Sequence, residues 1–232
     1  MKLIKPSYEI LTEIDGEKIL IEIEKAARTC YKSEEKVCIE EYPLYATSAR
    51  NLIPLIMNKN HQAMLEFGPS ITVKFICDRG VSHELVRHRL CSFAQESTRY
   101  CNYTKGKFDG EITYIIPEWI SDEQIDLVKR MNEKNYTQID PAVIHWYNSL
   151  NESEQAYKLL SKEDWKPEKA RSVLPNSLST TICVKANLRE WRHIFTLRTA
   201  GAAHPQMREL MIPLLKEFQQ KIPLLFDNIN KG

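Results

Sequence analysis

Apolar residues recur every three to four positions over much of the chain, and this spacing predicts several amphipathic helices. The first follows Asp15-Gly16, where Leu20, Ile23 and Ala27 share one face. Capping residues and prolines mark where the later helices begin. These later helices are predicted at about 43–60, 82–89, 121–135, 140–161, 167–175, 187–198 and from 205 onward, with bends at Pro54 and Pro213.

Three shorter segments follow the pattern of strands rather than helices. Residues 71–76 are nearly all apolar on one face and end at Asp78-Arg79-Gly80, residues 112–116 are closed by Pro117, and 178–184 read LSTTICV. Few strands among many helices predict an α+β fold, with a central, mostly antiparallel sheet packed with helices. We expect one domain over 1–232, with a helical insertion at about 118–165.

Composition narrows the class of partner. The chain has 232 residues and a formal net charge of +1, so no overall field draws it to nucleic acid or to a membrane. No apolar run reaches the roughly 18 residues that span a bilayer, and the N-terminal residues lack the apolar run of a signal peptide. The six cysteines match no zinc-ligand spacing, so we expect no metal and a cytoplasmic protein with reduced thiols.

The segment 87–99, RHRLCSFAQESTR, is the strongest candidate for chemistry. Arginine forks bind phosphates in a bidentate manner, and hydroxyl groups complete such sites. Taken alone, Arg87-His88-Arg89 is more typical of a solvated basic turn. Because Gln95, Ser97 and Arg99 follow at short spacing, an anion-binding loop becomes the better interpretation.

Two further segments carry arginines that would complete an anion site. On a helix over 187–198, Arg198 shares a stripe with Trp191 and Phe195, so its guanidinium would be partly desolvated. A partly desolvated guanidinium interacts strongly with negative charge that develops during a reaction. The alternative is an amphipathic helix with extended surface arginines. Arg171, in KARSVLP, is either a third phosphate ligand or an exposed side chain.

Glycine-rich phosphate loops are absent from the sequence, so side chains must hold any anion. Two rival functions stay open on the residues alone. The first is a nucleotide hydrolase with Ser97 or Cys91 as nucleophile, its thiol activated by neighbouring cations. The second is an RNA-binding module that stacks bases on Tyr100, Tyr103 and Trp191, against which the near-zero net charge argues.

Taken together, these segments resemble the flavin-dependent thymidylate synthases. The family signature is R-H-R, seven residues, then Ser, and here it is Arg87-His88-Arg89 followed by Ser97. Further segments that resemble the family in the right order are AARTCY (26–31), His61 to Glu66, RSVLP (171–175) and NLREWRHIFTLRTAGAAHPQMREL (187–210). The similarity covers nearly the whole chain and is weakest over 118–165.

The resemblance implies the fold of the thymidylate synthase complementing proteins and a specific reaction. Deoxyuridine monophosphate (dUMP) is methylated to deoxythymidine monophosphate (dTMP), with 5,10-methylenetetrahydrofolate as the carbon donor. FAD, reduced by NADPH, supplies the hydride, and no cysteine of the enzyme acts as nucleophile. The family forms homotetramers that share the flavin between subunits.

The resemblance also assigns residues. Arg198 is expected to be catalytic and to stabilise the anion that forms on the uracil ring. The positions expected to bind dUMP are Glu84, Leu85, Val86, Arg87, Gln95, Glu96, Ser97, Thr98, Arg99, Arg171 and Arg198. Those expected to bind FAD are Arg87, His88, Arg89, Gln95, Asn187, Leu188, Arg189, His193, His61, Ala63 and Glu66, with Cys30 nearby. The chain departs from the commonest family pattern at Glu84, Gln95, His193, Cys30 and Ala63.

Overall fold

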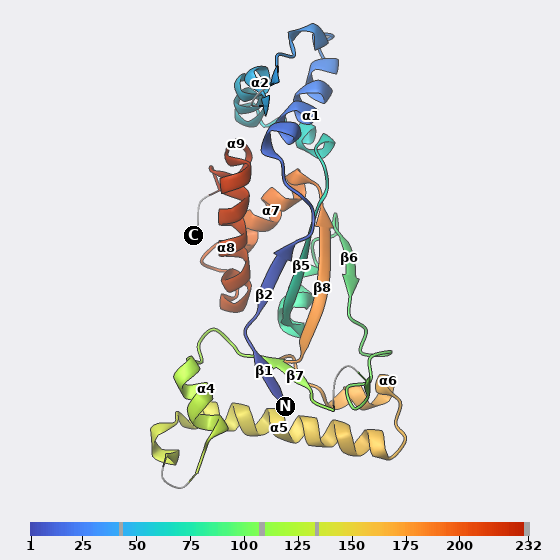
Figure 1. Ribbon diagram of the computed structural model, residues 1–232, viewed down its shortest axis with the longest axis vertical. Helices are drawn as coiled ribbons and strands as arrows, with labels where there is room; N and C mark the ends of the chain where they lie inside the picture. The colour runs from blue at the N-terminus through green and yellow to red at the C-terminus, as the bar shows by residue number, and fades with distance from the viewer. Residues whose placement is uncertain (42–43, 107–109, 133–134, 230–232) are drawn as a thin grey trace. The chain divides into compact units, whose positions relative to one another are not determined.

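The computed structural model describes residues 1–41, 44–106, 110–132 and 135–229, and the chain divides into two compact units (Figure 1). The first unit comprises 1–7, 75–85 and 94–182, and the second comprises 8–74, 86–93 and 183–232. Helices and strands both contribute, so the predicted α+β class is confirmed. Among the described residues, no helix is both long enough and apolar enough to cross a bilayer.

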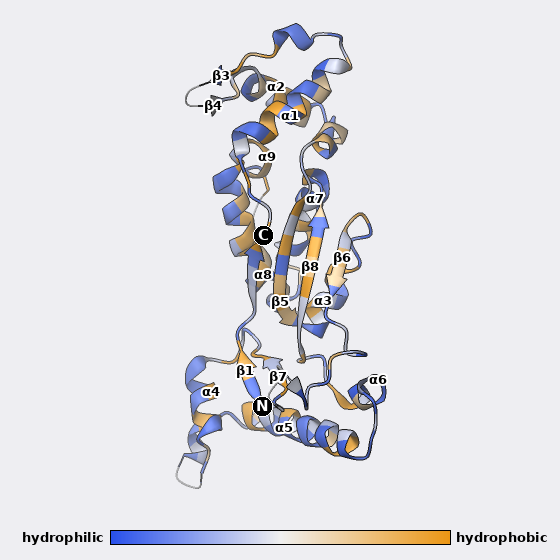
Figure 2. Ribbon diagram, turned by 45° about the vertical axis from the view of Figure 1, so that its right-hand side comes forward, coloured by the Kyte–Doolittle hydropathy of each residue, from blue (hydrophilic) through white to orange (hydrophobic). Residues whose placement is uncertain are grey.

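The largest sheet has four antiparallel strands in the order β2-β5-β8-β6. These strands are β2 (Ser7–Ile10), β5 (Ile71–Asp78), β8 (Ser179–Ala186) and β6 (Ser92–Gln95). Alternate residues of β5 and β8 are buried, and both strands carry hydrophobic as well as hydrophilic residues (Figure 2). The sequence predicted β5 and β8, whereas β2 and β6 are only four residues long, with no buried residue to mark them.

In the first unit, β1 (Lys2–Ile4) pairs in parallel with β7 (Thr113–Ile115). The 22-residue helix α5 (Pro141–Lys162) lies beside this pair, and Leu150 and Tyr157 pack in one cluster with Ile112 and Tyr114 (Figure 1). The other elements of this unit are α3 (Arg79–Leu85), α4 (Asp122–Lys129), η4 (Tyr136–Gln138), α6 (Pro167–Ala170) and η5 (Arg171–Val173).

The second unit is mainly helical. Helix α7 (Leu188–Arg198) packs on α8 (Pro205–Lys221) through a cluster of aromatic rings in which Trp191, Phe195 and Phe218 lie 5.0 to 5.5 Å apart between centroids. The other elements are α1 (Gly16–Thr29), η1 (Glu34–Lys36), β3 (Glu40–Glu41), β4 (Leu44–Tyr45), α2 (Thr47–Asn58), η2 (Gln62–Phe67) and α9 (Pro223–Phe226).

Several predicted helix ends need correction. Helix α2 begins at Thr47, after β4, while the predicted start at Pro43 lies outside the described residues. Helix α4 ends at Lys129 rather than near Asn135, and the C-terminal region holds a second helix, α9, after α8. The caps predicted at Ser121 and Asn187 are confirmed, because each side chain accepts a backbone N–H at a helix start, and Asp15 caps α1 in the same way.

Candidate active site

Helix α7 places the predicted catalytic arginine. The Asn187 side chain caps the helix by accepting the Glu190 N–H at 2.9 Å, and Trp191 anchors its buried face by donating from Nε1 to the Ile71 carbonyl at 3.0 Å. Trp191 and Phe195 are fully buried, whereas Arg198 ends the same stripe half-buried. The predicted stripe is therefore confirmed, and Arg198 lies at the end of the stripe that solvent can reach.

The Arg87-His88-Arg89 triplet lies on a turn rather than on a helix, which corrects the sequence prediction. Helix α3 ends at Leu85, and Ser82 lies inside it, bonded to the Arg79 carbonyl, instead of capping a later helix. The turn is closed by the Cys91 N–H, which donates to the His88 carbonyl at 3.1 Å. It buries His88 and exposes the two arginines, so both cations face outward from one buried imidazole.

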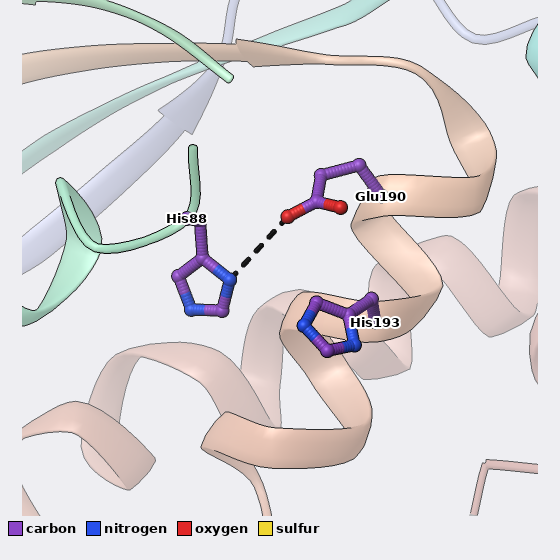
Figure 3. Close-up of side chains that lie close together, drawn as sticks. All are labelled: His88, Glu190 and His193. Carbon is purple, nitrogen blue, oxygen red and sulfur yellow. Dashed lines mark ion pairs between the residues drawn. The ribbon is translucent and has the colours of Figure 1, made fainter. Parts of the chain in front are cut away.

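His88 lies between two polar partners. Arg198 Nε donates to His88 Nε2 at 3.0 Å. On the other side of the ring, His88 Nδ1 lies 3.4 Å from Glu190 Oε1 (Figure 3). His193 follows Glu190 by one helical turn, with its ring centroid 5.7 Å from that of His88. Burial, together with the positive charge of Arg198 and the nearby His193, lowers the pKa of His88 to about 4, so the imidazole is neutral near pH 7.

A cavity of about 310 Å³ opens on this cluster. Its lining residues are Arg87, His88, Arg89, Leu90, Glu190, His193, Leu197 and Arg198. Within the described part of the chain, no side chain forms an ion pair or hydrogen bond with the guanidinium of Arg87 or Arg89. The cavity therefore offers cations to an incoming anion, as a phosphate site requires.

The predicted flavin-side residues gather around two further cavities that share Arg189. One, of about 620 Å³, is lined in part by Glu66, Asn187 and His193. The other, of about 680 Å³, includes Cys30, His61 and Ala63. Arg189 connects η2 to α7 through a 2.5 Å hydrogen bond from its Nη1 to Glu66 Oε1. Leu188 is fully buried, so only its backbone can meet a ligand.

The other predicted nucleotide residues belong to the first unit. Arg171 Nη1 donates to Thr98 Oγ1 at 3.0 Å, and the backbone N–H of Arg99 donates to Ser97 Oγ at 3.3 Å. The Gln95 amide donates to Ser82 Oγ and Thr180 Oγ1. Glu96 accepts from the Tyr103 hydroxyl at 2.9 Å.

Three consecutive predicted residues differ in exposure where α3 ends. Glu84 is half-buried and Val86 is exposed, whereas the Leu85 side chain is buried and leaves only its backbone to a ligand.

Cys91 is unsuited to act as the nucleophile of a rival hydrolase. The neighbouring arginines were expected to lower its pKa, but burial and the nearby Glu190 carboxylate raise the pKa of the thiol to about 12. A thiol with that pKa is protonated near pH 7, and the thiolate is the reactive form.

Glu190 is the residue of this cluster that sequence reasoning did not assign to a site. Its place three residues after Asn187 predicted a capping role, but its buried carboxylate lies toward His88.

Comparison with known proteins gives one consistent family. Residues 14–224 match the family model described as "Thymidylate synthase complementing protein". A flavin-dependent thymidylate synthase of Corynebacterium efficiens is 31% identical over 219 residues, covering 93% of this chain and 80% of that protein. One from Geobacter sulfurreducens is 30% identical over 209 residues, covering 89% and 80%.

A solved structure shares the fold. The UMP/dUMP methylase PolB from Streptomyces cacaoi, bound with 5-Br dUMP, superposes with a TM-score of 0.72. The match covers 98% of this chain and 96% of that one at 18% sequence identity, so it supports the fold alone. The fold predicted from the sequence is therefore confirmed.

Proposed function

This chain belongs to the thymidylate synthase complementing protein family, that of the flavin-dependent thymidylate synthases, and we propose that it methylates dUMP to dTMP. In the balanced reaction, dUMP, 5,10-methylenetetrahydrofolate and reduced FAD give dTMP, tetrahydrofolate and oxidised FAD. NADPH then returns FAD to its reduced form.

The observation that carries this proposal is the cavity on which Arg87, Arg89 and Arg198 converge around the buried His88. A nucleotide and a dinucleotide cofactor both bring phosphates, and only seven glycines are present to build backbone cradles. Arginine side chains are therefore the natural anion ligands here. The arrangement supports a site assembled from guanidinium groups.

The residues proposed to bind FAD match both its anionic phosphates and its apolar ring system. Arg87, Arg89 and Arg189 would hold the anionic part, and the cavity that includes Cys30 and Ala63 is mainly apolar in its lining. Reduced flavin, when bound, supplies the hydride. His88, Gln95, Asn187, Leu188, His193, His61 and Glu66 complete the proposed flavin set.

Different side chains are proposed to bind the phosphate of dUMP and to act on its uracil ring. Arg171, Ser97 and Arg99 would hold the phosphate of dUMP, with Thr98 orienting Arg171 through the 3.0 Å bond between them. Glu84, Leu85, Val86, Glu96 and Gln95 would border the nucleotide. Arg198 would stabilise negative charge on the uracil ring, and its partly desolvated position strengthens that interaction.

The visible absorbance of the purified protein tests the proposal. We expect a yellow protein whose flavin bands bleach when NADPH is added without oxygen and return when oxygen is admitted. Failure to retain or bind FAD would remove the proposal. Flavin-free protein that hydrolyses a nucleotide would favour the hydrolase instead, and steeply salt-dependent RNA binding without flavin would favour the RNA-binding module.

A further inference from the structure

Two side chains hold His88 from opposite sides of its ring. Arg198 Nε and His88 Nε2 are 3.0 Å apart, and His88 Nδ1 and Glu190 Oε1 are 3.4 Å apart. The second contact is long for a hydrogen bond, so its effect is chiefly electrostatic. Because the His88 and Glu190 side chains are only 4% and 7% exposed, little water screens that contact.

The proton count fixes the tautomer of His88. The Nε of arginine always carries hydrogen and never accepts, so His88 Nε2 must present a lone pair to it. The neutral ring has one proton, which therefore lies on Nδ1 and faces the Glu190 carboxylate. The opposite tautomer would place two N–H groups against each other at the Arg198 contact. An acceptor at position 190 is thus what makes the Arg198 contact favourable.

We propose that Glu190 is a positioning residue for Arg198, acting through the imidazole of His88. The carboxylate keeps the His88 proton on Nδ1, and the free lone pair on Nε2 then holds the guanidinium by its Nε. This contact restricts the orientation of the guanidinium plane of Arg198, which lines the cavity. The catalytic part of this inference rests on the proposed function, while the tautomer does not.

A metal ion is the alternative use of the same side chains. Ligand atoms of His88, Glu190 and His193 lie within 4.8 Å of one another (Figure 3). However, an ion bound at His88 Nδ1 would move the ring proton to Nε2, where it opposes the Arg198 N–H. Arg87 and Arg89 line the same cavity and add further repulsion toward a dication. The geometry therefore favours the positioning role of Glu190 over a metal site.

The test uses two replacements of Glu190 in the full-length, FAD-loaded protein. Glu190→Gln keeps an oxygen acceptor of the same length, and Glu190→Met removes the acceptor at similar size. Glu22→Met, on the exposed face of α1, is the matched control. Nitrogen-15 NMR of labelled histidine reports which ring nitrogen carries the proton, and the His88 signals are assigned by their loss in His88→Gln.

We expect the Nδ1–H tautomer in wild type, Glu190→Gln and the control, and a shift toward Nε2–H in Glu190→Met. With dUMP as substrate, kcat should fall about 10- to 100-fold in Glu190→Met, as it does when other outer residues that orient a ligand are removed. KM should change less than about threefold, and Glu190→Gln should keep kcat within about threefold of wild type.

An unchanged tautomer in Glu190→Met, or a kcat equal to wild type, would overturn the proposal. The proposal would also be overturned if His88 in Glu190→Gln no longer had its proton on Nδ1, or if the kcat of Glu190→Gln fell as far as that of Glu190→Met. If Glu190→Met does not fold, the His88 tautomer and the kcat of Glu190→Gln decide whether the proposal stands. A wild-type protein that makes no dTMP but shows the Nδ1–H tautomer would contradict the proposed function and leave the placement of Arg198 standing.

Discussion

Arg198 places a cation where a buried aromatic stripe reaches the cavity, and its Nε is held by His88. Replacing it with alanine removes a preorganised donor together with its hydrogen bond to His88, and it leaves the other proposed flavin ligands unchanged. We expect Arg198→Ala to bind FAD normally and to lose about 10²- to 10³-fold in kcat. Steady-state assays and flavin titration measure the two effects. Arg130→Ala, an exposed arginine on the first unit, should match wild type in both.

At the same scale, the low pKa of His88 makes stability depend on pH. The folded pKa of about 4 lies below the unfolded value of about 6.5, so the folded state binds fewer protons. The stabilisation is therefore complete above about pH 6.5 and is lost as pH falls toward 4, by about 3 kcal/mol in all. Urea unfolding at several pH values should show this loss in wild type.

His88→Gln is the control for that measurement, because glutamine does not titrate. Its unfolding free energy should fall less between pH 7 and 4 than that of wild type. Burial raises the pKa of the neighbouring Glu190, and this carboxyl group is present in both proteins, so the comparison separates its effect from that of the imidazole. Parallel curves for the two proteins would show that His88 is not the group responsible.

At the scale of elements, the start of α1 meets the end of α8 at Gly16. A Cβ built at Gly16 would lie 2.2 Å from the Lys221 carbonyl oxygen, so backbone must shift to accept it. Glycine-to-alanine changes at helix positions usually stabilise by up to about 1 kcal/mol. Here we expect Gly16→Ala to destabilise instead, by more than about 1 kcal/mol in urea unfolding.

Gly201→Ala provides the contrast, because no described atom lies within 4 Å of a Cβ built there. That variant should unfold within about 0.5 kcal/mol of wild type or slightly above it. If Gly16→Ala proves as stable as Gly201→Ala, the close approach of α1 to Lys221 is wrong.

Elements also show how far the sequence alone could go. Cap residues such as Asn187 interact with neighbours a few positions away, so α7 and its buried stripe were predictable. For residues 86–91 the sequence supported both a helix and a turn, because nothing local distinguishes three consecutive basic residues on a helix from the same residues on a turn. The buried position of His88 and the role of Glu190 depend on residues about a hundred positions apart.

For the whole molecule, the assembly state follows from family membership as a prediction. A homotetramer would have a mass of about 108 kDa, four times the 27.1 kDa of one chain. Light scattering coupled to size-exclusion chromatography measures this directly. A monomeric mass for an active, flavin-bound protein would contradict the expectation of sites shared between subunits. The single domain with an insertion at 118–165 likewise stays a prediction.

Formation of dTMP is the measurement that tests the central claim most directly. The purified protein is incubated with dUMP, 5,10-methylenetetrahydrofolate, FAD and NADPH, and the nucleotides are identified by mass spectrometry. We predict dTMP in the complete mixture, none when the folate is omitted, and at least a hundredfold less with Arg198→Ala. A folded, FAD-bound wild-type protein that leaves dUMP unchanged in the complete mixture would contradict the account.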